Sequence, residues 1–237
     1  MLNITFIQIL YNKSEVFRKK KETLLAELKK RIIDLEQKPG DILKLSKKSI
    51  NHCVNERTKE AQKDLKDAEE LIKKYDKQIK ALKKEISVKI NNTELQFKDL
   101  ANLKLDQLEN NLMSAKEEFL EAKILFDFIK NANIYQPRTK SLQEFNSYVG
   151  GLSDFCGELV TKLRTDSINQ TISSATFNDY ISLIKNIYIE LSKYSFTNPS
   201  GNRAKINQLK SYIKEAQKMQ YEKKYEEDKI SKQRLAT

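Results

Sequence analysis

The sequence predicts an all-α protein, a bundle of about six to seven helices, and three observations lead to that fold class. Only five glycines and three prolines occur among 237 residues, whereas β-sandwiches and barrels need turn residues about every 8–12 positions. Apolar residues recur at helical spacing along most of the chain. The glycines, at 40, 150, 151, 157 and 201, form neither a G-x-G-x-x-G loop nor a Walker loop, which excludes the dinucleotide-binding and P-loop folds.

The first two helices are separated by a proline. We expect the first helix over residues 3–36, where the apolar stripe leaves the lysines and arginines on the other side. Residues 38–41 must end it or kink it sharply, because Pro39 lacks a backbone donor and disfavours helix at the preceding residue. Asp41 is then a suitable N-cap for a second stretch over residues 42–54.

The remaining helices are separated by polar breaks. We expect them over residues 58–88, 94–131, 142–165, 176–193 and 203–231, with breaks at 91–93, 131–140 and 198–201. No repeat of fixed period occurs. We therefore expect one helical domain over residues 1–231, with a break near 38–41, and a flexible tail over 232–237.

The positive charge is concentrated in the first part of the chain. The formal net charge is +11, of which residues 1–90 carry +9 and residues 91–237 carry +2. A basic half joined to a nearly balanced half favours an anionic partner bound by the first half. An equally open alternative is that the lysines coat long helices as a solvated surface.

Few residue types are available for catalysis. The single histidine, His52, excludes H-E-x-x-H zinc sites and disfavours Ser-His-Asp or Cys-His chemistry. Two cysteines cannot form a disulfide framework, which favours a reducing compartment. No apolar run approaches the roughly 20 residues of a membrane span, and residues 1–10 do not resemble a secretory signal. We expect a cytoplasmic protein without membrane contact.

The remaining route to catalysis is a hard metal ion held by carboxylates. Acids three or four residues apart share a helix face, and two such pairs stand in unusually apolar surroundings. Glu118 and Glu121 form the first pair, and Asp154 and Glu158 form the second, in the least charged window of the chain. Three of the five glycines fall in that second window, which indicates close helix approach or room for a substrate. The alternative is that Asp154 is a helix N-cap and the other acids border the core.

At these two pairs the sequence resembles the translin family, and within it the catalytic subunit, translin-associated factor X, and its archaeal relatives. The family's Q-E-[YF]-[ILV]-E-A pattern is similar to EEFLEA at 117–122, followed by FIK at 128–130. Its D-Y-L-x-G-[LV]-[AS]-D-x-x-G-E-L pattern is similar to NSYVGGLSDFCGEL at 146–159. Weaker similarity covers 41–50 and 205–217. The chain departs from the pattern at Glu117, where glutamine is common, at Val160, and at the interruption over 38–40.

The resemblance implies a translin-like fold of about seven helices and an activity. It implies Mg²⁺-dependent endonuclease action on single-stranded RNA inside an octameric shell. We expect Mg²⁺ as the cofactor, with Mn²⁺ as the alternative ion. The shell would be a homo-octamer or a hetero-octamer shared with a translin-like subunit. Glu118, Glu121, Asp154 and Glu158 match the family's catalytic and metal-binding acids one by one, and Glu121 and Asp154 are our preferred direct ligands.

Phosphate contacts are expected in the basic half. The candidates lie around the segment that resembles the family: Lys44, Lys47, Lys48, Arg57 and Lys59. Two other functions stay open at this point. One is a non-catalytic translin-type subunit that binds single-stranded RNA or DNA, and the other is a helical scaffold with no nucleic-acid role.

Overall fold

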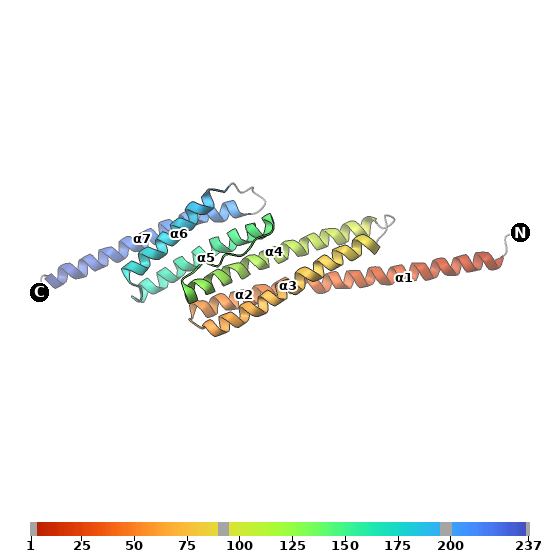
Figure 1. The fold of residues 1–237 in the computed structure, drawn as a ribbon, viewed down its shortest axis with the longest axis horizontal. Coiled ribbons are helices and arrows are strands. Elements are labelled where there is room, and N and C mark those ends of the chain that lie inside the picture. The colour runs from red at the N-terminus through yellow and green to blue at the C-terminus, as the bar shows by residue number, and fades with distance from the viewer. Residues whose placement is uncertain (1–3, 90–94, 195–200, 236–237) are drawn as a thin grey trace. The chain divides into compact units, whose positions relative to one another are not determined.

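The computed structural model describes residues 4–89, 95–194 and 201–235, and every regular element in those ranges is an α-helix. The helices are α1 (Ile4–Glu36), α2 (Lys38–Val54), α3 (Thr58–Lys89), α4 (Leu95–Asn131), α5 (Leu142–Ile168), α6 (Ser174–Ser192) and α7 (Asn202–Leu235) (Figure 1). This confirms the predicted all-α fold class. No helix in the described ranges has the length and apolar character that crossing a bilayer requires.

The break between the first two helices falls at Gln37, one residue before the expected segment. Pro39 lies inside the first turn of α2, where the backbone donors have no partner within the helix and a missing one costs little. The prediction that Asp41 caps α2 is wrong, because α2 already begins at Lys38. Asp41 instead lies in the first turn, where its charge favours the positive end of the helix dipole.

Serine N-caps precede two later helices. The side chain of Ser141 accepts a hydrogen bond from the backbone of Glu144 at the start of α5, and Ser173 does the same for Thr176 at α6, both at 3.1 Å. These are ordinary N-caps. Since α5 begins at Leu142, Asp154 lies well inside a helix, and its alternative reading as an N-cap is wrong.

Two expected breaks fall wholly or mostly outside the described residues. The predicted break at 91–93 lies outside them, as does most of the predicted 198–201 separator. The helix α7 extends to Leu235, four residues beyond its expected end, so the predicted tail over 232–237 is helical as far as it is described.

The chain divides into two compact units. The first unit comprises residues 1–42 and 70–112, and the second comprises residues 43–69 and 113–237. Within the first unit, the hydroxyl of buried Tyr75 donates to the carbonyl of Leu35, and Arg31 pairs with Glu85 at 2.6 Å. The expectation of a single domain stays a prediction.

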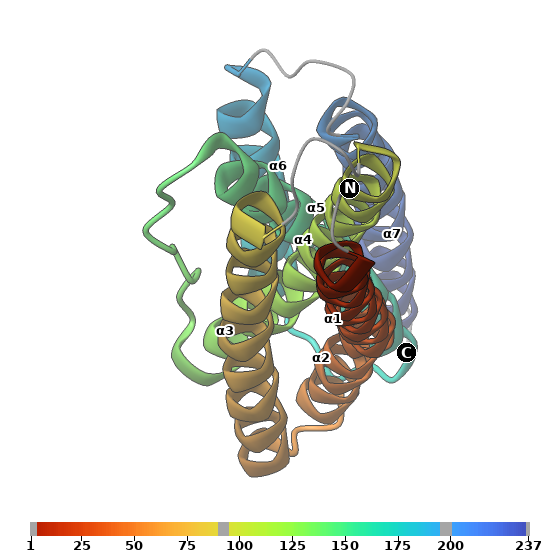
Figure 2. The same ribbon diagram turned by 90° about the vertical axis from the view of Figure 1, so that its right-hand side faces the viewer.

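The second unit contains the largest core. Helix α5 packs against α7, and α6 packs against both, so the three run alongside one another in Figures 1 and 2. Phe128 of α4 makes edge-to-face contacts with Phe155 and Tyr180, each with ring centroids 5.4 Å apart. Buried apolar residues of α4 and α5 fill the space between these helices. This core fixes the positions of the acidic segments.

Gly151 allows α4 and α5 to approach closely. A Cβ atom at this position would lie 2.8 Å from both the carbonyl oxygen of Glu117 and the backbone nitrogen of Glu121. We therefore expect Gly151→Ala to destabilise the protein by about 1–3 kcal/mol, because the backbones must separate. Urea denaturation of the full chain measures this change.

Gly40 supplies the matched control. It also lies in a helix, α2, but nothing stands within 4 Å of its would-be Cβ. Gly40→Ala is expected to stabilise the protein by up to about 1 kcal/mol through helix propensity. Equal effects of the two substitutions would contradict a close approach at Gly151.

Candidate functional site

The two predicted acid pairs lie next to each other in the second unit. Helix α4 contributes Glu118 and Glu121, and α5 contributes Asp154 and Glu158. The charges of Asp154, Glu118 and Glu158 all act on Glu121. The four side chains chosen from the sequence therefore form one electrostatically coupled group, which we call the acidic cluster.

Glu121 is the most deeply placed member of the cluster. Its exposed fraction is 7 %, and burial, followed by repulsion from the other three acids, raises its pKa to about 8. Burial, followed by repulsion from Asp154 and Glu118, also raises the pKa of Glu158. At neutral pH the cluster therefore retains a proton that a divalent cation would displace.

Helix α7 adds a cation to the site. The Nζ atom of Lys205 donates to Asp154 Oδ2 at 2.5 Å and also to Glu117 Oε1. Burial alone would lower the pKa of Lys205, but the hydrogen bonds to both carboxylates outweigh it and the pKa is raised. For the pKa of Glu117, burial outweighs the hydrogen bond. Burial together with the charges of Asp154 and Glu118 raises its pKa despite the bond to Lys205.

Two further glycines make room for side chains of the site. A Cβ at Gly150 would collide with the carboxyl group of Glu117, and a Cβ at Gly157 would lie 2.8 Å from the hydroxyl oxygen of Tyr212. Burial, followed by the nearby acids, raises the pKa of Tyr212. The glycines of the second window therefore serve helix packing around the acids, as the sequence indicated.

Glu117, Lys205 and Tyr212 were missed as site residues by the sequence analysis. Glu117 appeared only as a departure from the family pattern, and Lys205 only as part of a weak similarity. Lys205 is 88 residues from Glu117 and 51 residues from Asp154. No spacing rule links residues so far apart in the chain, so no local pattern could have indicated this contact.

The donor atoms of the cluster suit a hard divalent cation. Carboxylate oxygens are the ligands that Mg²⁺ and Mn²⁺ favour, and burial makes unpaired acids costly without a cation. In the described ranges, no three Asp, Glu, His or Cys side chains are already close enough together to hold an ion. The ammonium of Lys205 lies between Glu117 and Asp154 instead. The residues fit such an ion by their chemistry, and side chains must shift to bind it.

The five candidate phosphate contacts are exposed. Three lie on α2, one in the following turn and one at the start of α3: Lys44, Lys47, Lys48, Arg57 and Lys59. None forms an ion pair with a residue that the structure describes. Exposure is compatible with phosphate binding and equally with a solvated surface. Their role stays a prediction.

His52 and Cys53 do not join the acidic cluster. His52 Nδ1 lies 3.1 Å from Asp64 Oδ2. Cys53 is buried, and burial raises its pKa to about 11, so it is not a thiolate at neutral pH. Both residues therefore serve packing between α2 and α3.

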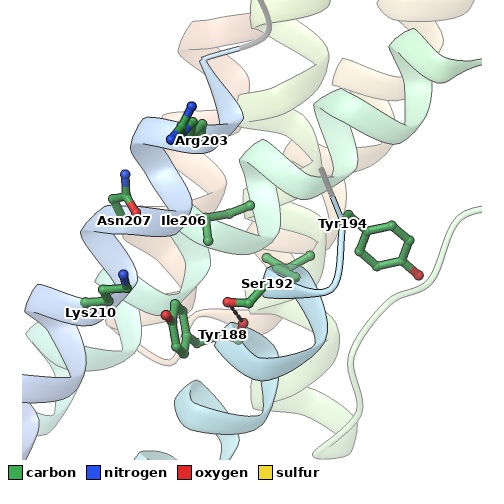
Figure 3. Close-up of a pocket in the computed structure, with 8 residues that line it drawn as sticks. Tyr188, Ser192, Tyr194, Arg203, Ile206, Asn207 and Lys210 are labelled. Carbon is green, nitrogen blue, oxygen red and sulfur yellow. Dashed lines mark hydrogen bonds between the residues drawn. The ribbon is translucent and has the colours of Figure 1, made fainter. Parts of the chain in front are cut away.

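A polar pocket that no sequence pattern indicated lies between α6 and α7. Its volume is about 390 Å³, and Figure 3 shows Arg203, Asn207 and Lys210 along α7 facing it, opposite Tyr188 of α6. Lys210 Nζ lies 5.8 Å from the centroid of the Tyr188 ring. At 100° per residue, these α7 residues lie largely on the side of the helix away from Lys205.

The fold and the site together define a class of protein: a helical bundle in which two neighbouring helices carry a half-buried carboxylate cluster and a third supplies a lysine. Three solved structures are similar to the chain over 90% of its length, each at 19% identity. They are apo-NeC3PO (TM-score 0.64, 96% of that chain), AfC3PO (0.62, 97%) and an AfC3PO–duplex RNA complex (0.63, 97%).

This likeness shows the fold, which is translin-like, and confirms that part of the prediction. No family model matches the chain, and no curated protein matches it.

Proposed function

We propose that this protein is a translin-family, Mg²⁺-dependent endoribonuclease that cleaves single-stranded RNA inside an oligomeric shell. The observation that carries the proposal is the acidic cluster. The four acids that match the family pattern come from two helices and act on one another electrostatically. A translin-like fold supports the proposal, as does the neighbour described as AfC3PO bound to duplex RNA.

The acids of the cluster would have two roles, which are ion binding and proton transfer. Glu118, Glu121, Asp154 and Glu158 would hold the ion, which when bound supplies a Lewis acid for phosphodiester hydrolysis. Glu121, whose pKa is about 8, would have to lose its proton for its carboxylate to bind such an ion. Burial, followed by repulsion from Asp154 and Glu118, raises the pKa of Glu158, which makes it a better proton acceptor than an ordinary carboxylate, and Glu158 would accept the proton of the attacking water. His52 lies beside Asp64 of α3 and not in the acidic cluster, so carboxylates would perform the proton transfer.

The exposed basic residues of α2, of the turn after it and of α3 would supply the sequence-independent contacts to RNA. Lys44, Lys47, Lys48, Arg57 and Lys59 would neutralise phosphates. Such contacts make RNA binding salt-dependent without selecting a sequence. We propose single-stranded RNA as the substrate. Because one similar structure is an AfC3PO complex with duplex RNA, duplex RNA must be tested beside it.

A cleavage assay tests the function. We expect end-labelled single-stranded RNA to be cut in Mg²⁺, to remain intact in EDTA, and to be cut more slowly as a duplex. RNA binding measured at two salt concentrations should weaken at the higher one. Salt-sensitive binding without cleavage in Mg²⁺ would contradict the enzyme.

The non-catalytic alternative has one observation in its favour. Lys205 bridges two acids, and the described residues show no ready set of three ligands. A translin-type binding subunit would retain RNA with or without Mg²⁺. A scaffold would bind no RNA at all.

The proposed shell can be checked on the same preparation. Light scattering of a homo-octamer would give about eight times the 27.7 kDa of one chain. A monomer or dimer would indicate that a translin-like partner subunit completes the shell.

A further inference from the structure

The ammonium group of Lys205 lies inside the acidic site and is not part of an exposed surface ion pair. Its side chain is 28 % exposed, and its two acceptors, on α4 and α5, are 24 % and 31 % exposed. Other ion pairs in the described part of the second unit join two residues only, either within one helix, such as Lys162 with Asp166, or between helices, such as Arg164 with Glu215. A half-buried ammonium shared by two helices costs solvation and side-chain entropy. Because this position is costly, we expect Lys205 to have a role in the site besides adding surface charge.

The charges around Lys205 are unbalanced. The ammonium group of Lys205 bonds Glu117 and Asp154, and its charge also acts on Glu121. Glu118 and Glu158 belong to the same electrostatically coupled group of acids, so a single positive charge is set against five carboxyl groups. The site therefore has a net demand for positive charge that Lys205 meets only in part.

We propose that Lys205 is a resident counter-ion, which a divalent cation displaces from Asp154 and which Glu117 then retains. This inference rests on the proposed function, because Asp154 must be a ligand of the ion. With the ion absent, Lys205 limits repulsion between α4 and α5. With the ion present, its ammonium keeps the bond to Glu117 and is free to contact an RNA phosphate.

The position of the Glu117 side chain suits it to hold Lys205. Its carboxyl group occupies the space that the missing Cβ of Gly150 leaves, and it bonds Lys205 directly. It belongs to the site without being one of the four acids that match the family pattern. The departure from the common glutamine at this position is thereby explained, because an amide would hold an ammonium less strongly than a carboxylate does.

The test measures ion affinity rather than catalysis. Mn²⁺ is titrated into the full-length protein without RNA, and the free ion is followed by electron paramagnetic resonance. We expect Lys205→Met to tighten Mn²⁺ binding about tenfold, since a neighbouring charge changes proton affinity by one to three pKa units at such distances. Lys214→Met, which removes an exposed lysine of the same helix, should change nothing.

A double-mutant cycle isolates the role of Glu117. Glu117→Gln leaves Asp154 as the strong partner of Lys205, so it should weaken Mn²⁺ binding several-fold in the wild-type background. In the Lys205→Met background the same substitution should have a clearly smaller effect. Additive effects would contradict the retention of Lys205 by Glu117.

The outcomes separate this inference from the proposed function. If the wild type binds Mn²⁺ and Asp154→Asn abolishes binding, while Lys205→Met binds equally or more weakly, the counter-ion role is overturned and the metal site stands. If neither the wild type nor Lys205→Met binds Mn²⁺, both proposals are overturned. Circular dichroism of each variant shows that weaker binding does not arise from unfolding.

Discussion

Asp154→Asn is expected to reduce Mg²⁺-dependent RNA cleavage by more than about 100-fold while RNA binding persists. Residues that only support a metal ligand are worth about 10–100-fold, and we place Asp154 among the ligands themselves. The amide is isosteric but carries no charge, so it binds a hard cation poorly. Single-turnover cleavage and filter binding of the same RNA measure the two effects separately.

Asp166→Asn is the control for this substitution. Asp166 lies on the same helix, α5, and pairs with Lys162 at 3.0 Å. Neutralising it removes one charge from the helix without touching the acidic cluster. If Asp154→Asn cleaves RNA at the wild-type rate, the assignment of the site is wrong.

Glu121→Gln is expected to abolish cleavage and, at the same time, to stabilise the metal-free protein at high pH. The folded-state pKa of Glu121, about 8, lies above its ordinary value of 4.5. Between these values the folded protein retains a proton that the unfolded chain releases, so wild-type stability falls as the pH rises through this window. Glutamine does not titrate, and its advantage is therefore complete above about pH 8.

Urea denaturation in EDTA at pH 5 and at pH 8.5 measures the effect. Each pKa unit corresponds to about 1.4 kcal/mol, and relaxation of the site reduces the total, so we expect a stabilisation of at least about 1 kcal/mol at the higher pH. Glu190→Gln, at an exposed position on α6, should show no such pH dependence. A variant that is destabilised at pH 8.5 would mean that the carboxylate of Glu121 is well compensated in the folded state.

Local sequence patterns were sufficient to predict the helices and the pairs of acids that share a helix face. The 3.6-residue period placed most helix ends within a few residues, and Pro39 marked the break at Gln37. Glu118 with Glu121, and Asp154 with Glu158, share a face because their spacing is three and four residues. Asp41 was assigned wrongly because proline is compatible with the first turn of a helix, so α2 begins earlier than expected.

The sequence by itself determined an all-helical chain with two acid pairs in apolar segments, since both features depend on neighbours within one or two turns. Only the tertiary structure decided that these pairs meet, that Gly151 brings α4 against α5, and that α7 supplies Lys205. Contacts between helices join residues far apart in the chain, and they depend on which faces pack together. The deep burial of Glu121, and with it the pKa of about 8, exists only once those faces have packed.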